Sequence, residues 1–165
     1  MVAHTQFSLF LNNLRYSILL FSCQKFLHKG ENTLSNQTPS WNQMVQQCEG
    51  LGLLAKKLYV VFTKPVNGIG PIMEVLDAHL AYQNKIQDEG IMFGAGPFSD
   101  DTEKNWNGDG MVIIRAESMS AAKEIADNDP MHKAGARTYE IRPWLLNEGK
   151  VTIDLTFSNK SMMLK

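Results

Sequence analysis

Residues 91–116, IMFGAGPFSDDTEKNWNGDGMVIIRA, decide the fold because they predict two successive strands without a helix between them. The runs IMFGAGPF (91–98) and MVIIRA (111–116) have the length and the apolar content of strands. The loop between them is polar and carries several acids and one tryptophan. A strand that follows a strand without a helix excludes a simple alternation of strands and helices, and the elements on either side complete the pattern.

A strand and a helix are predicted before the pair. The β-branched and aromatic run KLYVVFTK (57–64) has strand length, and Pro65 with the turn-rich NGIGP (67–71) ends it. Pro71 then stands at a first helical position, where its missing N–H costs nothing. Residues at helical spacing continue this helix until Gly90 ends it, namely Ile72, Leu76, His79, Gln83 and Ile86.

A second helix and a last strand are predicted after the pair. Ser118 or Ser120 can cap a short helix through AAKEIADN (121–128). Asp129 ends this helix, because the residue before a proline is pushed away from helical angles. The run ARTYEIRPW (136–144) then alternates as a strand.

The order strand, helix, strand, strand, helix, strand predicts an α+β domain with a ferredoxin-like fold. In this fold an antiparallel sheet carries both helices on one face. The other face needs a cover, and a second copy of the domain is the usual one, so we expect a homodimer. The tail VTIDLTF (151–157) alternates apolar and polar residues. It predicts an extra C-terminal strand that either extends its own sheet or crosses to the partner's.

The first 55 residues are predicted to be a leader or linker outside the core, which then covers residues 56–165. Their acid-poor, serine-containing start is similar to a transit peptide, and YSILLFSC (16–23) is similar to a secretory or lipoprotein signal. A third possibility is an upstream extension with translation from Met44. The apolar run is far shorter than the roughly 20 residues of a membrane span, so no membrane partner is expected. We expect a cytoplasmic protein, with organellar or secretory targeting left open by the leader.

Composition narrows the class of partner. The 165 residues suit one domain, with 44% hydrophobic and 20% charged residues as in a globular protein. A net charge of -1 gives no electrostatic basis for a nucleic-acid partner, so a small neutral molecule is expected. Neither Cys23 nor Cys48 lies at metal-ligand spacing from a His or a second Cys. A reducing compartment, no metal and no cofactor are therefore expected.

Two longer stretches carry a family resemblance. AHLAYQNKIQDEGIMFGAGPF (78–98) and SAAKEIADNDPMHKAGARTYEIRPW (120–144) resemble the YCII-related family in motifs, order and spacing, from Leu58 to Trp144. The resemblance implies a ferredoxin-like domain that dimerises as an α/β barrel. It also implies an active site built on a His–Asp pair, which falls on His79 and Asp129. Some family members and fold relatives act on chlorinated or lactone intermediates of aromatic breakdown.

The residues themselves give His79 a similar interpretation. It shares a helical face with Ile72, Leu76 and Ile86 and so points toward the sheet. An acidic neighbour would fix the tautomer of its ring and leave the other nitrogen free for proton transfer. Asp129, at the end of the second helix, is placed to be that neighbour. A hydrogen-bonded core histidine and a turn-forming aspartate are the non-catalytic alternative.

Further residues are candidates for substrate binding. His132 follows the Asp-Pro turn, where a loop histidine is by default exposed. Gly96 and Pro97, with Gly94, suggest close backbone approach to a ligand or a strand bulge. Arg142 and Trp144 are candidates to orient an anionic or aromatic substrate. Three loop acids resemble a carboxylate cluster, which is usually solvated: Asp100, Asp101 and Glu103.

Two functions from different classes remain. The first is a small enzyme without metal or cofactor, in which His79 and Asp129 perform acid–base chemistry on a carbonyl or lactone-like metabolite, by isomerisation, elimination or hydrolysis. The second is a non-catalytic dimeric domain that binds a small ligand or serves in assembly.

Overall fold

The structure is a computed structural model that describes residues 38–158 and 161–164. The predictions for residues 1–37, including the targeting alternatives and the environment of Cys23, lie outside the described residues. Ser40–Lys165 form one compact unit. That unit includes helix α2 (Trp41–Gly50), which begins at Ser40 with a reciprocal capping box to Gln43 and buries Val45 and Cys48. The boundary at residue 55 between leader and core stays a prediction.

Four antiparallel strands form the central sheet in the order β2-β3-β1-β4. These are β1 (Lys56–Pro65), β2 (Met92–Pro97), β3 (Gly110–Ile114) and β4 (Arg137–Leu146). The predicted pair of successive strands is confirmed, because β2 pairs directly with β3. Strand β1 lies between β3 and β4 and pairs with both. This antiparallel α+β sheet is consistent with the ferredoxin-like fold predicted from the element order.

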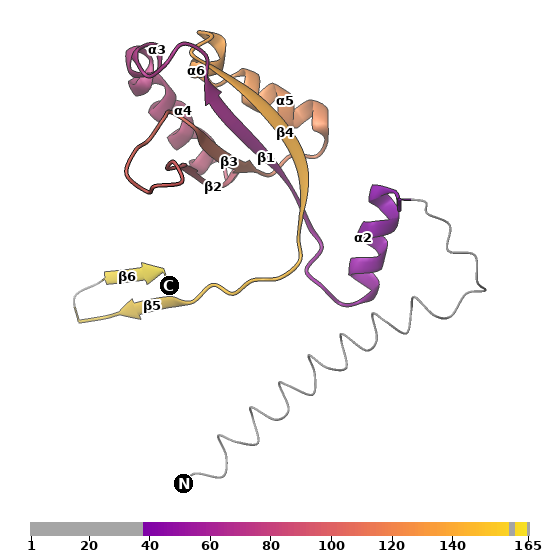
Figure 1. Ribbon diagram of the computed structural model, residues 1–165. Coiled ribbons are helices and arrows are strands. Elements are labelled where there is room, and N and C mark those ends of the chain that lie inside the picture. Colours follow the sequence, from indigo (N-terminus) through magenta and orange to yellow (C-terminus); the bar gives the residue numbers. More distant parts are fainter. Residues whose placement is uncertain (1–37, 159–160, 165) are drawn as a thin grey trace. The chain divides into compact units, whose positions relative to one another are not determined.

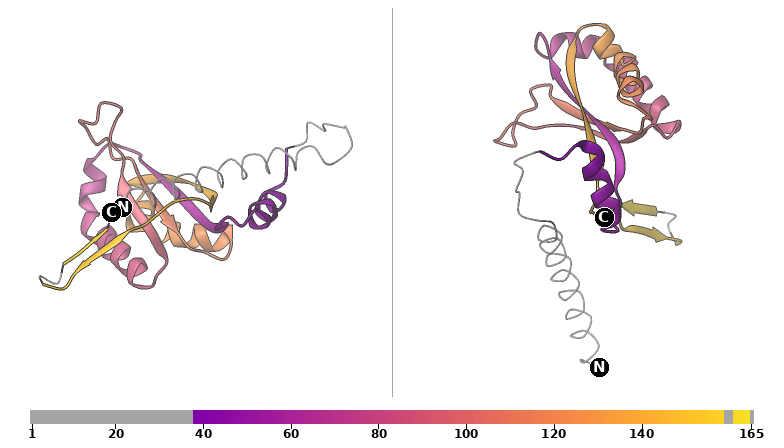
Figure 2. Two further views of the ribbon diagram at one scale, coloured as in Figure 1. Left: turned by 90° about the horizontal axis from the view of Figure 1, so that it is seen from below. Right: turned by 90° about the vertical axis from the view of Figure 1, so that its right-hand side faces the viewer.

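Helices α4 (Leu76–Asp88) and α5 (Met119–Asp127) lie on the same face of this sheet, as Figures 1 and 2 show. The first predicted helix is two helices, α3 (Gly70–Glu74) and α4 (Leu76–Asp88). They are separated at Val75, whose backbone (φ -114°, ψ 10°) leaves the helical range. The break lets Ile72 turn into the core, where it is fully buried, while α4 follows its own direction.

The second predicted helix is also followed by another. Ser118 caps α5 (Met119–Asp127) by accepting from the backbone of Ala121, which decides between the two candidate caps. A short helix α6 (Pro130–Lys133) begins directly afterwards. Asp129 is therefore more than a helix stop, because it is the N-cap of α6. His132, predicted in a loop, lies in α6 and is half-buried.

Two clusters make up the core between sheet and helices. One joins Val61 and Ile114 of the sheet to Ala122 and Ala126 of α5, with Tyr139 and Ile141 packed against it. The other joins Ile72, Met131 and Ala136, with Val75 and Leu76 beside it. The second cluster fixes the start of α4 against α6. His79 and Asp129, which these two helices carry, are thereby placed side by side.

The C-terminal tail forms a hairpin of its own. Strand β5 (Ile153–Thr156) pairs with β6 (Ser161–Leu164) in a separate two-stranded sheet. The expected strand exists, but within the chain it does not extend the four-stranded sheet, because β6 supplies its pairing partner. Sequence analysis did not predict β6, since the alternation in VTIDLTF does not specify what the strand pairs with.

None of the helices in the described residues has both the length and the apolar character needed to cross a membrane.

Candidate functional site

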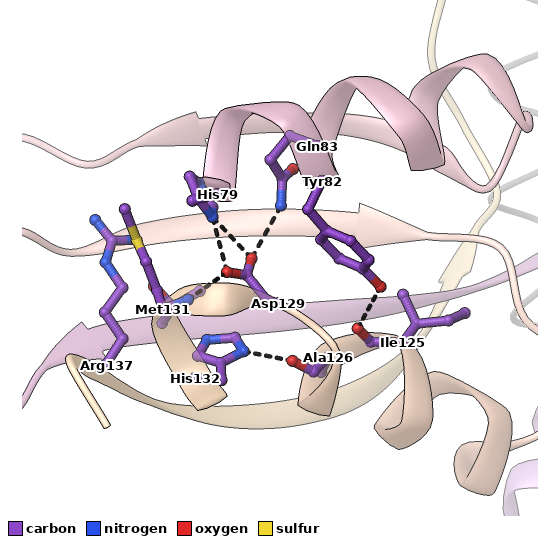
Figure 3. Close-up of polar contacts among 10 residues, drawn as sticks. His79, Tyr82, Gln83, Ile125, Ala126, Asp129, Met131, His132 and Arg137 are labelled. Atoms are coloured by element: carbon purple, nitrogen blue, oxygen red, sulfur yellow. Dashed lines mark hydrogen bonds and ion pairs between the residues drawn. The ribbon is translucent and has the colours of Figure 1, made fainter. Parts of the chain in front are cut away.

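The side chains of His79 and Asp129 meet between α4 and α6 (Figure 3). Nδ1 of His79 lies 2.9 Å from Oδ1 and 2.8 Å from Oδ2 of Asp129. The His79 side chain is 16% exposed and that of Asp129 is 6% exposed. The two candidates are 50 positions apart in the chain, and packing of the second core cluster brings them together.

Local structure orients the carboxylate of Asp129. Its extended backbone precedes Pro130, which takes the first position of α6, and Oδ1 accepts a hydrogen bond from the N–H of Met131 at 2.9 Å. Oδ2 accepts from Nε2 of Gln83 at 3.1 Å. Both oxygens are thus occupied by donors, and the carboxylate has little freedom to rotate.

Electrostatics determine which tautomer His79 adopts. Burial alone would raise the pKa of Asp129, but hydrogen bonds from His79 and from the N–H of Met131 outweigh it, and the pKa is lowered. Asp129 is therefore ionised at neutral pH and can only accept a hydrogen bond. Nδ1 of His79 must carry the proton, and Nε2 is left as the basic nitrogen.

A cavity of about 450 Å³ opens beside the pair. Its walls come from α4, the β2–β3 strands and loop, α6 and the start of β4. The predicted residues among its lining are His79, Gly96, Pro97, Asp129 and His132; residues that were not predicted include Thr63, Gln83, Trp106, Met131 and Arg137.

The structure places two predicted binding residues away from this cavity. Arg142 is exposed and pairs through Nε with Glu140 at 2.6 Å, while Trp144 is 36% exposed. Neither is among the lining residues. A role for them in binding would require a surface outside this cavity. At the opposite edge of the sheet, β2 has a register shift between Met92 and Gly94, as expected for the strand bulge that was one of the two explanations for the glycines.

His132 is the second histidine of the cavity. Its Nδ1 donates to the carbonyl oxygen of Ala126 at 2.6 Å, and its ring lies against that of Tyr139 with the centroids 4.7 Å apart and the planes tilted by 46°. Burial lowers the pKa of His132, although the Ala126 contact and the charge of Asp129 oppose this effect. His132 is therefore a neutral ring at neutral pH.

Arg137 is the charged residue that sequence analysis missed. Its Nη1 donates to Oγ1 of Thr63 at 2.7 Å. Burial lowers its pKa, against the opposing charges of Asp129 and Asp109. The alternation of inward and outward residues along β4 would have indicated that Arg137 faces the helices. Arg137 has the parity of Tyr139 and Ile141, which pack on the helix side, whereas Arg142 has the opposite parity.

The loop acids have a different role. Oδ1 of Asp100 accepts from the backbone and hydroxyl of Thr102, and Oδ2 accepts from the amide of Asn105 at 2.8 Å. These contacts lower the pKa of Asp100 and shape the loop. Among the residues that the structure describes, no group of three or more His, Cys, Asp or Glu side chains is arranged to hold a metal.

Comparison with known proteins identifies a family and similar solved structures. No curated protein matches the chain. One of the similar structures is 5-chloro-2-hydroxyhydroquinone dehydrochlorinase (TftG) from Burkholderia phenoliruptrix AC1100, in complex with 2,5-dihydroxybenzoquinone, at 24% identity and a TM-score of 0.44. The match covers 53% of this chain and 92% of that one. This likeness is too distant to carry a conclusion about activity.

The family comparison is more extensive. A model of the YCII-related domain matches residues 58–145, more than half of the 165-residue chain. The matched segment contains all four strands of the central sheet for most of their length, and both His79 and Asp129. The chain therefore belongs to the YCII-related family.

Proposed function

We propose that the protein is a small enzyme in which His79 and Asp129 perform general acid–base chemistry on a small carbonyl or lactone-like metabolite. The observation that supports this most directly is the contact of both Asp129 oxygens with Nδ1 of His79 at 2.8–2.9 Å, on the wall of a cavity. A histidine with one nitrogen held by a carboxylate and the other basic is suited to proton transfer at neutral pH.

The proposed step begins with a proton on a carbon next to the substrate's carbonyl group. Nε2 of His79 removes this proton, and the imidazolium that forms is stabilised by Asp129. Return of the proton to another carbon gives isomerisation, whereas departure of a leaving group gives elimination. In a hydrolytic variant, Nε2 would instead take a proton from an attacking water. The three reaction types share the same pair and differ in the substrate.

The test is the tautomer of the His79 ring, read from its nitrogen signals by NMR in the wild type and in Asp129→Asn. The wild type should carry the proton on Nδ1, and loss of the carboxylate should let the Nε2-protonated tautomer appear, because the charged acceptor of the Nδ1 proton is gone. Asp127→Asn is the matched control, since Asp127 is a nearby carboxylate that contacts Tyr139 instead. A tautomer mixture that is the same in the wild type and in Asp129→Asn would contradict the proposed pair.

Turnover separates the enzyme from a binding domain. A panel of small lactones, enones and chlorinated hydroquinones should include a substrate whose conversion falls by about two to four orders of magnitude in His79→Gln, the range for a general base. The alternative is a non-catalytic ligand-binding or assembly domain. It would be favoured if His79→Gln lowered the free energy of unfolding while leaving every conversion in the panel unchanged.

We also propose that two copies associate through the sheet face opposite the helices, as a dimeric α/β barrel. Val61 packs on the helix side, so Val60 and Phe62 point to the other face. Ile113 pairs with Val60 across the ladder and shares that face. Phe62 and Ile113 are only half-buried within one chain. Covering them with a second sheet would remove apolar area from water.

A further inference from the structure

Arg137 is a cation in the wall of the His79 cavity without a carboxylate partner in the described part of the chain. The ion pairs recorded there are His79–Asp129, Lys85–Glu89 and Arg142–Glu140. Arg137 instead donates to the neutral hydroxyl of Thr63. Its Nε–H is buried and has no hydrogen-bond partner among the described residues.

A partly buried arginine without an ion pair lowers the stability of the fold unless a ligand or another group compensates its charge. A guanidinium that leaves water without a counter-charge loses hydration, and a buried N–H without an acceptor costs roughly 1–3 kcal/mol. Arg142, five positions later on the same strand, avoids this cost because its side chain is exposed to water and pairs with Glu140. Asp129 and Asp109 are near enough for their charges to act on Arg137, but neither forms an ion pair with it. The oxygens of Asp129 are already used by His79, Gln83 and Met131.

The surroundings of Arg137 hold its side chain in one position. Thr63, buried on β1, fixes one end of the guanidinium, and the ring of Trp106 lies 5.8 Å from its central carbon. Thr63, Trp106 and Arg137 all line the cavity that contains His79. Figure 3 shows the Arg137 side chain running beside Met131 toward the level of His79. A planar donor group fixed in this way is suited to a planar, negatively charged acceptor.

We propose that Arg137 binds a carboxylate group of the substrate and so selects anionic over neutral molecules. This proposal rests on the proposed function in placing the reacting carbon of the same molecule near His79. It adds a substrate class, a small carboxylate-bearing carbonyl or ring compound, and it replaces the neutral molecule expected from net charge. Net charge averages over the whole chain, whereas a ligand in the cavity meets the local charge of Arg137.

The test uses benzoate and benzamide, which share a ring and differ in charge. Binding is measured by NMR from the Arg137 Nε–H signal and the His79 ring signals, so no turnover is needed. We expect benzoate to bind about tenfold more tightly than benzamide or better, as for a hydrogen bond to a charged group. Arg137→Gln should abolish this preference, Arg137→Lys should retain part of it, and Arg142→Gln should leave it intact.

The outcomes separate this proposal from its alternatives. The proposal would be overturned if the two probes bound equally or if Arg137→Gln left the preference unchanged. It would also be overturned if about 20 mM benzoate, which largely fills a site of millimolar Kd, did not shift the Arg137 signal. If Arg137 served only to hold Thr63, Thr63→Val would destabilise the fold as much as Arg137→Gln and neither would alter the preference. A charge preference in a protein whose His79 tautomer does not respond to Asp129→Asn would support the Arg137 site and contradict the acid–base pair.

Discussion

His79 and Gln83 lie one turn apart on α4 and donate to the same carboxylate oxygen of Asp129, at 2.8 and 3.1 Å. The i, i+4 spacing puts both donors on one side of the helix. Gln83 thus restrains the carboxylate that orients His79. The other amide atom of Gln83, Oε1, is buried and has no hydrogen-bond partner among the described residues. The amide of Gln83 therefore has one hydrogen bond from its side chain to the described part of the protein, and that bond is the one to Asp129.

Gln83→Met tests this restraint. We expect turnover of a substrate found in the panel to fall about fivefold, the rate equivalent of one neutral hydrogen bond of about 1 kcal/mol. The free energy of unfolding should change little, because the variant also removes the unpaired Oε1. Gln46→Met, at an exposed position of α2, is the control for the added methionine. If the free energy of unfolding fell by about 1 kcal/mol or more, the loss of turnover would reflect a structural role of Gln83.

The lowered pKa of Asp129 predicts a specific acid sensitivity. Where the folded pKa lies below that of the unfolded chain, the unfolded state binds more protons, so stability falls as pH falls. The contribution is fully present above about pH 4, the ordinary aspartate value, and is lost as pH drops through the folded value. Asp129→Asn should therefore be less stable than the wild type at neutral pH by about 1–3 kcal/mol.

The difference between the two proteins should shrink below pH 4. Denaturant unfolding across the acid range measures both free energies, and taking their difference cancels the contribution of the other carboxylates. A difference that stays constant down to the lowest pH would show that the hydrogen bonds to Asp129 do not favour its charged form.

The core beneath the site should be sensitive to truncation. Met131 is 1% exposed and packs with Ile72 and Ala136. Met131→Ala should lower the free energy of unfolding by about 2–5 kcal/mol, the range for emptying a packed methionine site. Met73→Ala, at a 52% exposed position of α3, should cost less than about 0.5 kcal/mol. Equal effects of the two variants in denaturant unfolding would contradict the assigned core.

Local patterns were enough to predict the order of strands and helices around the central sheet, but not the pair of His79 and Asp129. Strand-length runs, Pro71, Ser118 and the Asp129-Pro130 step are short-range signals, and they reproduce the element order of the sheet. The pair itself came from a family resemblance, because helical periodicity assigns His79 to a face but does not name its partner. Asp129 could be assigned to the end of a helix from the sequence. Its role as the cap of α6 could not, because α6 has only four residues and is too short to show helical periodicity.

Arg137 was missed for a physical reason. Its role depends on contacts to Thr63, 74 positions away, and to Trp106 in the β2–β3 loop. Arg142 and Trp144 attracted the substrate-binding prediction by residue type alone. Strand parity separates them from the cavity, since residues one step apart on a strand face opposite sides of the sheet. Parity counted from the buried Val61 and its ladder partner Ile141 would have selected Arg137 instead.

The dimer has a direct test in the mass of the protein in solution. Light scattering at micromolar concentration should report twice the 18.6 kDa mass of the chain. Ile113→Glu places a charge on the half-buried sheet face and should return the mass to that of one chain, because burying an unpaired carboxylate is costly. Lys123→Glu, at an exposed position of α5, should leave the dimer intact. If the wild type has the mass of one chain, or if Ile113→Glu remains a dimer, then the open sheet face is not the interface and the α/β barrel proposal fails.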